Sequence, residues 1–248
     1  MSLRFSSAQR ATDPEIMDDF TCSGEVVERT LRELDVINQF LGGNSVTMSG
    51  LIEMVKLRSP AGDPITIADL GCGSGDLLRR FARYARQRAM PVRLIGIDAN
   101  PSIVDYARKH SVDYPEISFE SADVLSSEFA MKDYDIICGT LFFHHFDDDT
   151  LSRLFPQLVR QAKLGVLIND IHRHWLAYHS IRWLTRWFSS SSMVRYDAPL
   201  SVQRAFTRAD WKRVFDQAGI GHYRIAWRWA FRWKIMLFSS ESRLAQFW

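Results

Sequence analysis

The sequence predicts an α/β fold in which helices cover both faces of a doubly wound, mainly parallel seven-stranded sheet. Apolar runs rich in β-branched residues alternate with segments of helical periodicity, as in a sheet built from successive strand–helix units. A glycine-rich turn joins the first of these runs to a helical segment, an arrangement that builds a site for a polar ligand. A chain of 248 residues is long enough for one such domain with extra N-terminal helices and an insertion.

The glycine-rich turn lies between an expected strand at 65–70 and an expected helix at 77–88. An acid and three glycines define it: Asp69, Gly71, Gly73 and Gly75. The glycines let the backbone turn sharply and approach a ligand closely, and the free amides of the helix N-terminus favour polar or anionic groups. Asp76 stands where a dinucleotide-binding turn needs a small residue, and the Gly-Lys-Ser/Thr ending of a phosphate-binding loop is missing.

Three further strands follow, and each leads into residues that suit a ligand site. They are expected at 92–98, 117–120 and 134–141. The first ends on Asp98, about where an acid that binds a ribose is expected after a glycine turn. Asn100 and Pro101 then start a helix as its N-cap and first residue. The second strand leads to Asp123, and the third ends before the Phe-His-His-Phe segment of 143–146.

Taken in order, these motifs resemble those of the class I S-adenosylmethionine-dependent methyltransferases. The resemblance covers roughly residues 60–238 and implies a Rossmann-like sheet with S-adenosyl-L-methionine as cofactor. In that family the acid-glycine segment wraps the methionine part, the acid after the second strand bonds the ribose, the acid after the third faces the adenine, and the fourth strand ends beneath the sulfonium. The cofactor-binding positions implied here are Asp69, Gly71, Gly73, Gly75, Asp98, Ala99, Asp123, Val124, Gly139 and Leu141.

Polar side chains follow the fourth strand and the fifth strand, expected at 163–169, on the edge where open α/β sheets bind ligands. Histidine titrates near neutral pH, so it can take a proton from an acceptor as the methyl group moves. The expected catalytic residues are His145, Asp170 and His172. The expected substrate contacts are His144, Arg173 and Trp175, although His144 can equally shape the pocket through loop carbonyls. No metal site is expected, because no further ligand set accompanies these residues.

The chain is expected to consist of a helical extension or cap at 1–60 and a cofactor-binding domain at 61–248. An insertion at about 171–205 carries an apolar helical stripe beside Arg182 and Arg186. The stripe consists of Ile181, Trp183, Leu184, Trp187 and Phe188. We interpret the insertion as a substrate lid with an accessible, protease-sensitive serine run at 189–192. A membrane surface and a homodimer interface are the alternatives for the stripe.

The composition of the chain limits which classes of partner and which cellular compartment we expect. The net charge is only +2, but all eight tryptophans lie in the basic part of the chain after residue 170. Between 227 and 234 they alternate with arginine and lysine, as in strands with one buried face, so nucleic acid is not expected as a partner. No run approaches the about 18 apolar residues of a membrane span. Three scattered cysteines and the lack of a signal-peptide core predict a cytoplasmic protein.

These observations predict a methyltransferase that acts on a small hydrophobic or aromatic acceptor, with oxygen as the first choice of methylated atom. Carbon methylation of a quinone-like or polyketide acceptor is the alternative within the class, because the Phe-His-His-Phe segment resembles quinone-pathway methyltransferases. A cofactor-binding scaffold without turnover is the alternative outside the class.

Overall fold

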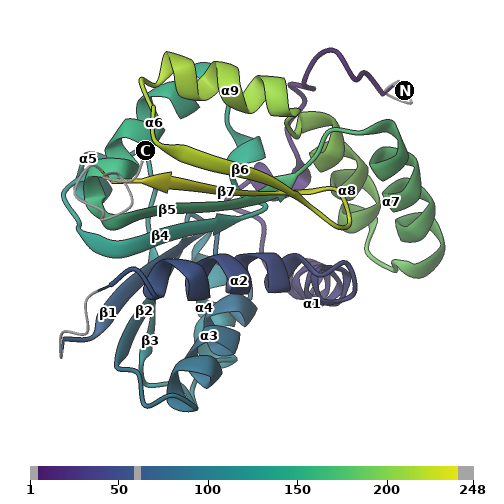
Figure 1. Cartoon of the computed structure of the whole chain (residues 1–248). Coiled ribbons are helices and arrows are strands. Elements are labelled where there is room, and N and C mark those ends of the chain that lie inside the picture. The colour runs from purple at the N-terminus through teal and green to yellow at the C-terminus, as the bar shows by residue number, and fades with distance from the viewer. Residues whose placement is uncertain (1–4, 59–62, 240–248) are drawn as a thin grey trace.

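A seven-stranded sheet with the strand order β3-β2-β1-β4-β5-β7-β6 forms the centre of the molecule (Figure 1). The first five strands pair in parallel, and β7 is antiparallel to both β5 and β6. The expected mainly parallel seven-stranded sheet is therefore confirmed. A computed structural model of the chain describes residues 5–58 and 63–239. The strands are β1 (Ile65–Leu70), β2 (Val92–Asp98), β3 (Ile117–Ser121), β4 (Tyr134–Thr140), β5 (Ala162–Ile171), β6 (Tyr223–Arg228) and β7 (Arg232–Phe238).

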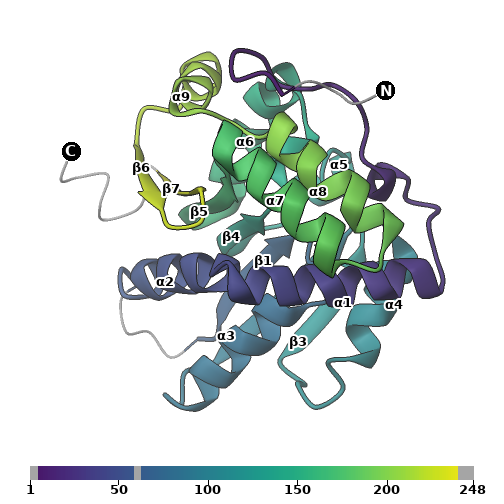
Figure 2. The same cartoon turned by 90° about the vertical axis from the view of Figure 1, so that its right-hand side faces the viewer.

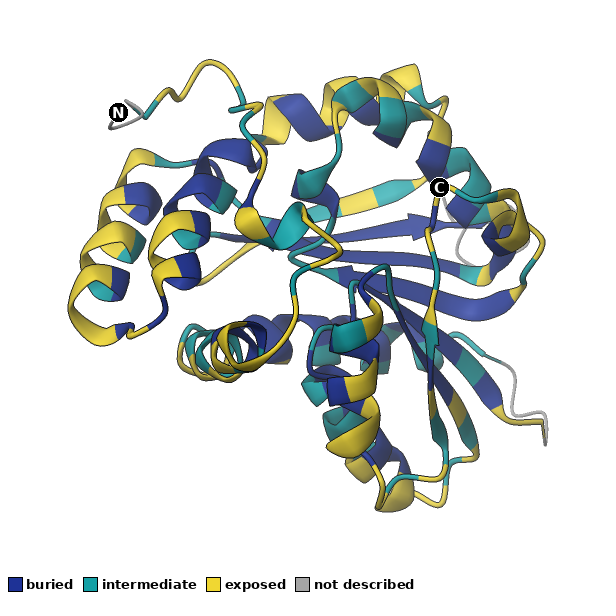
Figure 3. Ribbon diagram, turned by 180° about the vertical axis from the view of Figure 1, so that it is seen from behind, coloured by how far each residue is buried: buried dark blue, intermediate teal, exposed yellow. Residues whose placement is uncertain are grey.

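Helices cover both faces of this sheet. One apolar layer joins it to α2, α3 and α4, with Met54 and Phe81 fully buried, and the other joins it to α5, α6 and α9, with Phe155 and Trp211 fully buried. In Figure 3 the central strands are accordingly dark blue along most of their length. The helices are η1 (Ile16–Asp18), α1 (Glu25–Phe40), α2 (Gly43–Val55), α3 (Asp76–Arg86), α4 (Pro101–Lys109), α5 (Ser127–Ala130), η2 (Phe143–His145), α6 (Asp148–Gln161), α7 (Trp175–Phe188), α8 (Ser192–Arg204) and α9 (Arg208–Gln217).

The strand order reverses between β1 and β4, which are neighbours in the sheet although two strands separate them in the chain. At such a switch point the loops after adjacent strands lead to opposite faces, and a crevice opens at the carboxyl ends. The helix starts near this edge follow their sequence signals. The Asn100 side chain caps α4 through the Ser102 amide at 2.9 Å, and Pro101 is its first residue.

The helix α2 packs against the sheet. The Asn169 side-chain amide, at the end of β5, donates to the Gly43 carbonyl at 2.7 Å and to the Thr47 hydroxyl at 2.8 Å. The Thr47 and Thr140 hydroxyls lie 2.7 Å apart, which ties the same helix to β4. The boundary expected near residue 60 thus separates two parts of the chain that pack together.

The β6–β7 hairpin differs from the alternation that its sequence predicts. Arg232 and Lys234 are buried, because β7 lies between β5 and β6 with helix α2 against it. Lys234 Nζ pairs with Glu53 Oε2 at 2.8 Å, and Arg232 Nη2 donates to Asn38 Oδ1 at 3.0 Å. Burial lowers the pKa of Arg232 to about 10. The alternating pattern suggested that the charged side chains of this hairpin all lie on a solvent face. The burial of Arg232 and Lys234 shows that they do not.

The insertion after β5 forms a pair of helices, α7 and α8, that lies beside α1 (Figure 2). The serine run at 189–192 is partly accessible, since Ser190 and Ser192 are exposed. Ser189 and Ser191 are buried, and Glu33 of α1 accepts hydrogen bonds from the Ser190 and Ser191 amides at 3.0 and 3.2 Å. This carboxylate fixes the end of the insertion to α1. Within 5–58 and 63–239, no helix combines the length and apolar character needed to cross a membrane.

Candidate active site

The glycine-rich turn between β1 and α3 adopts the backbone that its sequence predicts. The three glycines Gly71, Gly73 and Gly75 all have positive φ angles, from +52° to +76°. A Cβ atom on Gly71 would lie 2.5 Å from Phe142 Cδ2, so a side chain does not fit there. A Cβ on Gly73 would meet only Leu31 Cδ2 of α1, at 3.8 Å. The turn therefore presents open backbone toward a space that α1 borders.

Asp98, at the end of β2, faces this turn. Its carboxylate accepts from the Gly73 amide at 3.3 Å and from the Asn100 amide at 3.0 Å. Burial raises the pKa of Asp98, while the hydrogen bonds from the two backbone amides oppose that effect. A carboxylate held by backbone amides beside a glycine turn can accept hydrogen bonds from the two hydroxyls of a ribose. Ala99, the next of the expected cofactor residues, directly follows Asp98 in the chain.

The other expected cofactor residues surround the same edge of the sheet. Asp123 is exposed and accepts from the Leu125 amide at 2.8 Å, and Val124 is buried behind it. Leu141 follows β4 with a φ of +57°, which is a strained backbone conformation for a residue with a side chain. Its backbone N–H donates a hydrogen bond to the Asn169 carbonyl at 2.8 Å, which helps to stabilise this conformation. Gly139 leaves no room for a side chain, since a Cβ would lie 2.6 Å from a Phe143 ring carbon.

Asp69 lies deeper than the rest of the acid-glycine segment. Its carboxyl group is almost fully buried, and the Cys138 thiol lies 3.5 Å from it. Burial raises the pKa of Asp69 to about 7 despite that thiol contact. A group buried in this way supports the turn from beneath.

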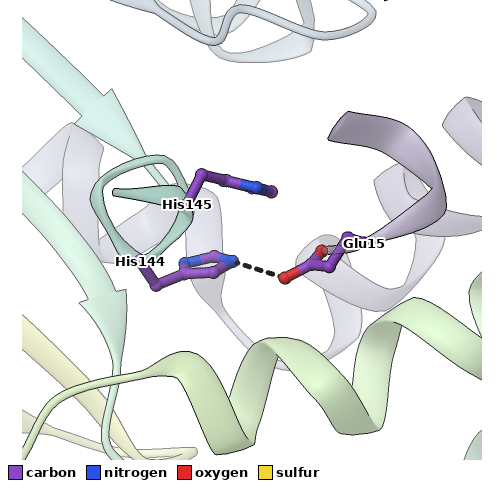
Figure 4. Close-up of side chains that lie close together, drawn as sticks. All are labelled: Glu15, His144 and His145. Carbon is purple, nitrogen blue, oxygen red and sulfur yellow. Dashed lines mark ion pairs between the residues drawn. The ribbon is translucent and has the colours of Figure 1, made fainter. Parts of the chain in front are cut away.

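His144 links the sheet to the N-terminal segment, as Figure 4 shows. Its Nδ1 lies 2.7 Å from Asp170 Oδ1, and its Nε2 lies 3.5 Å from Glu15 Oε1. Burial lowers the pKa of His144, but the two carboxylates outweigh burial and raise it to about 9. His144 is therefore an imidazolium at neutral pH, and both of its N–H groups point at acids.

His145 is partly exposed and stacks on His144, with 4.4 Å between the ring centroids. Its Nδ1 lies 2.6 Å from Asp18 Oδ1 of η1. Burial raises the pKa of Asp18, but the hydrogen bond and charge of His145, with a bond from Arg204, bring it well below its usual value. Because a carboxylate only accepts, this contact places a proton on Nδ1, so that in the neutral ring Nε2 is the atom that can accept a proton.

The structure separates the residues that follow β5 into two groups. Asp170 is fully buried beneath η2 and holds His144. Arg173 is also buried, and it donates to the Ala205 carbonyl at 2.8 Å and pairs with Asp210 at 2.9 Å, which gives it a structural role. His172 packs against Trp233, with 4.8 Å between the ring centroids, and burial lowers its pKa to about 4. A histidine with so low a pKa is a weak base.

Trp175, the last of the expected substrate contacts, is exposed at the start of α7. Its ring lies beside that of His174, with 5.9 Å between the ring centroids, whereas Asp170 accepts hydrogen bonds from His144.

Three side chains could hold a cation: Glu15, His144 and His145 offer ligand atoms within 4.8 Å of one another. Glu15 Oε1 and His144 Nε2 are buried and have no hydrogen-bond partner among the described residues. A metal ion would compete for Nε2 with the proton that His144 retains at neutral pH. It would also meet the positive charge of Arg204, whose guanidinium lies 3.9 Å from Glu15. The expectation that no metal binds stays a prediction.

Sequence reasoning missed Glu15, Asp18 and Arg204, which complete the surroundings of the two histidines. Arg204 donates to the His145 carbonyl at 2.6 Å and bonds Asp18 as well. No local pattern marks these residues, because the histidines that they contact are remote in the sequence. Glu15 and Asp18 lie more than a hundred positions from the histidines, and Arg204 lies about sixty positions from them.

Comparison with known proteins identifies the domain that carries this site. Residues 67–165 match the family described as a methyltransferase domain. This match to a methyltransferase domain covers less than half of the chain. The match runs from β1 into β5 and thus includes the glycine turn, Asp98 and both histidines of the methyltransferase domain.

A curated relative and two solved structures resemble the chain. The 2-phytyl-1,4-naphtoquinone methyltransferase of Thermosynechococcus vestitus is 30% identical over 104 residues, which are 41% of this chain. The match spans 45% of that relative's length. The plantazolicin methyltransferase BpumL in complex with SAH gives a TM-score of 0.60 at 15% identity, covering 87% of this chain and 99% of that one. The CMeT domain of the citrinin polyketide synthase gives 0.57 at 18% identity, covering 76% and 50%. At these identities the solved structures support the fold of the methyltransferase domain.

Proposed function

We propose that this chain transfers the methyl group of S-adenosyl-L-methionine to a small hydrophobic or aromatic acceptor, with an oxygen atom as the preferred target. The observation that carries the proposal is the geometry at the carboxyl edge of the sheet. The Gly73 amide donates to the Asp98 carboxylate at 3.3 Å, and His145 of η2 lies close enough for its charge to oppose the rise in the pKa of Asp98 that burial causes. The cofactor supplies an activated sulfonium methyl group.

The residues of the turn fit this cofactor. Asp98 would accept from the ribose hydroxyls, and Gly73 would admit the methionine part along its open backbone. Gly71 and Gly75 would shape the turn, since they pack against Phe142 and Phe119. Asp123 and Val124 would border the adenine, since they follow β3 at the same edge. We assign Gly139 and Leu141 to the floor of the site because they end β4 between these groups.

In the proposed reaction, His145 removes the proton from the acceptor. The acceptor O–H proton passes to Nε2 of His145 while the new C–O bond forms and the C–S bond breaks. Asp18 stabilises the imidazolium that results, because its carboxylate accepts from Nδ1 at 2.6 Å. Alignment of acceptor and donor supplies much of the rate of such a transfer.

The first test measures cofactor binding separately from turnover. Asp98→Ala should weaken S-adenosylmethionine binding by about 2–3 kcal/mol in calorimetric titration, because it removes a charged hydrogen-bond partner. His145→Ala should lower production of S-adenosylhomocysteine from phenol and hydroquinone acceptors by about 10²–10⁴-fold without changing that affinity. His179→Ala, on the exposed part of α7, is the matched control. Unchanged turnover in His145→Ala would contradict its role as base.

Carbon methylation is the second candidate, favoured by the naphtoquinone methyltransferase that is 30% identical to this chain over 104 residues. Mass spectrometry and NMR of the product distinguish a methyl ether from a ring methyl. Cofactor binding without product from any acceptor would instead support a scaffold. For the cellular setting we propose the cytoplasm, with support from the free thiols of Cys22, Cys72 and Cys138.

A further inference from the structure

The C-terminal end of α7 carries a cluster of exposed aromatic side chains. Trp183, Trp187 and Phe188 are 61%, 68% and 74% exposed. Trp183 lies with its ring centroid 6.4 Å from that of Trp187 and 6.3 Å from that of Phe188. Apolar surface of this size is costly to leave in water, and tryptophan is enriched where proteins meet the membrane–water interface. We call these three residues the aromatic cluster.

An arginine-lined hollow adjoins the aromatic cluster. Its volume is about 460 Å³, and its lining consists of Arg182, Thr185, Arg186, Trp187 and Arg195. None of these arginines forms an ion pair with a carboxylate of residues 5–58 and 63–239. The nearby arginines of α1 behave differently, since Arg29 and Arg32 pair with Glu25 and Glu28 of their own helix. Three uncompensated guanidinium groups around one hollow favour an anionic ligand such as a phosphate.

An apolar groove lies on the other side of Thr185, between α1 and α7. It has a volume of about 460 Å³, and most of its lining is aliphatic or aromatic. The apolar lining residues are Val36, Ile37, Phe40, Leu41, Leu184 and Phe188. Phe40 and Phe188 are exposed at its mouth. A hollow for anions and a groove for apolar groups, which share Thr185 in their linings, match the two halves of a phospholipid.

We propose that this face, formed by the end of α7 and the adjoining part of α1, docks on a membrane surface that contains anionic phospholipid. The headgroup phosphates would pair with Arg182, Arg186 and Arg195, and the aromatic cluster would insert among the acyl chains near the headgroups. Figure 2 shows that the α7–α8 pair and α1 lie side by side at the surface. A second copy of the chain is a poorer occupant, because a two-fold contact would bring the same unpaired arginines together.

The surface also suggests where the acceptor comes from, an extension that rests on the proposed methyl transfer. The helix α1 lines the groove with Val36 and Ile37, and on its other side it contacts the glycine turn. There, Leu31 approaches Gly73, and Asp35 accepts from the Ser74 hydroxyl at 2.7 Å. An acceptor dissolved in the membrane would therefore have only α1 between it and the cofactor site.

Flotation with lipid vesicles tests the docking without any measurement of turnover. The full chain should float with phosphatidylcholine vesicles that contain phosphatidylglycerol, and binding should decrease with added salt. The double variants Arg182→Glu/Arg186→Glu and Trp183→Ser/Trp187→Ser should each lower the bound fraction by about tenfold or more. Circular dichroism and unchanged S-adenosylmethionine affinity would show that the variants fold.

Two control variants change exposed residues elsewhere. Arg160→Glu on α6 reverses one exposed arginine, half of the charge change in the arginine double variant, and Met131→Ser after α5 removes one exposed apolar side chain. Both should float as the unaltered chain does. The proposal is overturned if no binding to the anionic vesicles occurs, or if the double variants bind as well as the controls. It is also overturned if the chain binds no vesicles but forms a dimer that the Trp183→Ser/Trp187→Ser change dissociates.

Activity on an acceptor carried in vesicles tests the extension separately. The Arg182→Glu/Arg186→Glu variant should lose turnover with acceptor in anionic vesicles and keep it with a water-soluble acceptor. Equal loss on both acceptors would overturn membrane supply while leaving the proposed methyl transfer intact. Absence of turnover by the unaltered chain on every acceptor would instead contradict the proposed methyl transfer, and flotation would still decide the docking.

Discussion

Replacing His144 with glutamine should remove a large part of the pH dependence of stability. The pKa of His144 is about 9 in the folded protein and 6.5 in an ordinary histidine, because Asp170 and Glu15 favour its charged form. A tenfold difference in proton affinity corresponds to about 1.4 kcal/mol, so protonation contributes about 3 kcal/mol to the free energy of unfolding. This contribution is fully present below pH 6.5, decreases above it, and is lost as the pH rises through about 9.

Urea unfolding followed by tryptophan fluorescence at several pH values between 6 and 10 measures the effect. The unaltered chain should lose about 3 kcal/mol more than His144→Gln does over this range. His179→Gln changes an exposed histidine of α7 and should follow the unaltered chain. If His144→Gln and the unaltered chain show the same pH dependence, the assignment of a buried imidazolium between two carboxylates is refuted.

Three further changes probe other parts of the structure. Asp18→Asn should lower turnover by about 10²-fold and alter its pH profile without weakening cofactor binding, because it removes the carboxylate that orients His145; a change confined to cofactor affinity would contradict this. Gly50→Ala should destabilise the fold by about 1–3 kcal/mol in urea unfolding, since the new Cβ would lie 2.5 Å from Leu167 Cδ1. Glu33→Gln should speed proteolysis in the loop between α7 and α8, which this carboxylate holds; an unchanged cleavage rate would show that other contacts suffice.

The sheet and the cofactor edge could be predicted because their signals are local. The glycine turn needs positive φ angles that its three glycines supply, and Asp98 follows its own strand directly. The Asn100–Pro101 start of α4 and the Thr207–Asp210 capping box of α9 are likewise determined within a few residues. Such patterns carry their geometry with them, so one sequence is enough to read them.

The surroundings of the two histidines could not be predicted, because their partners come from remote segments. Nothing near Glu15 or Asp18 indicates that η1 will lie against η2. Asp170 illustrates a second difficulty: its place at the edge of the sheet suggested catalysis, whereas full burial makes it the anchor of His144. Periodicity also failed for β7, where Arg232 is buried with few partners, since an alternating pattern does not reveal that both faces of a strand will be covered.

The position of Glu15 and Asp18 ahead of every strand has an evolutionary consequence. Two of the acids that contact His144 and His145 come from a short N-terminal stretch, whereas Asp170, Asp98 and the glycine turn belong to the sheet or follow its strands. Changes in that stretch can alter the surroundings of His145, the proposed base, while Asp98 and the glycine turn stay intact. Related enzymes could therefore acquire new acceptor chemistry by exchanging this peripheral segment, with no redesign of the central scaffold.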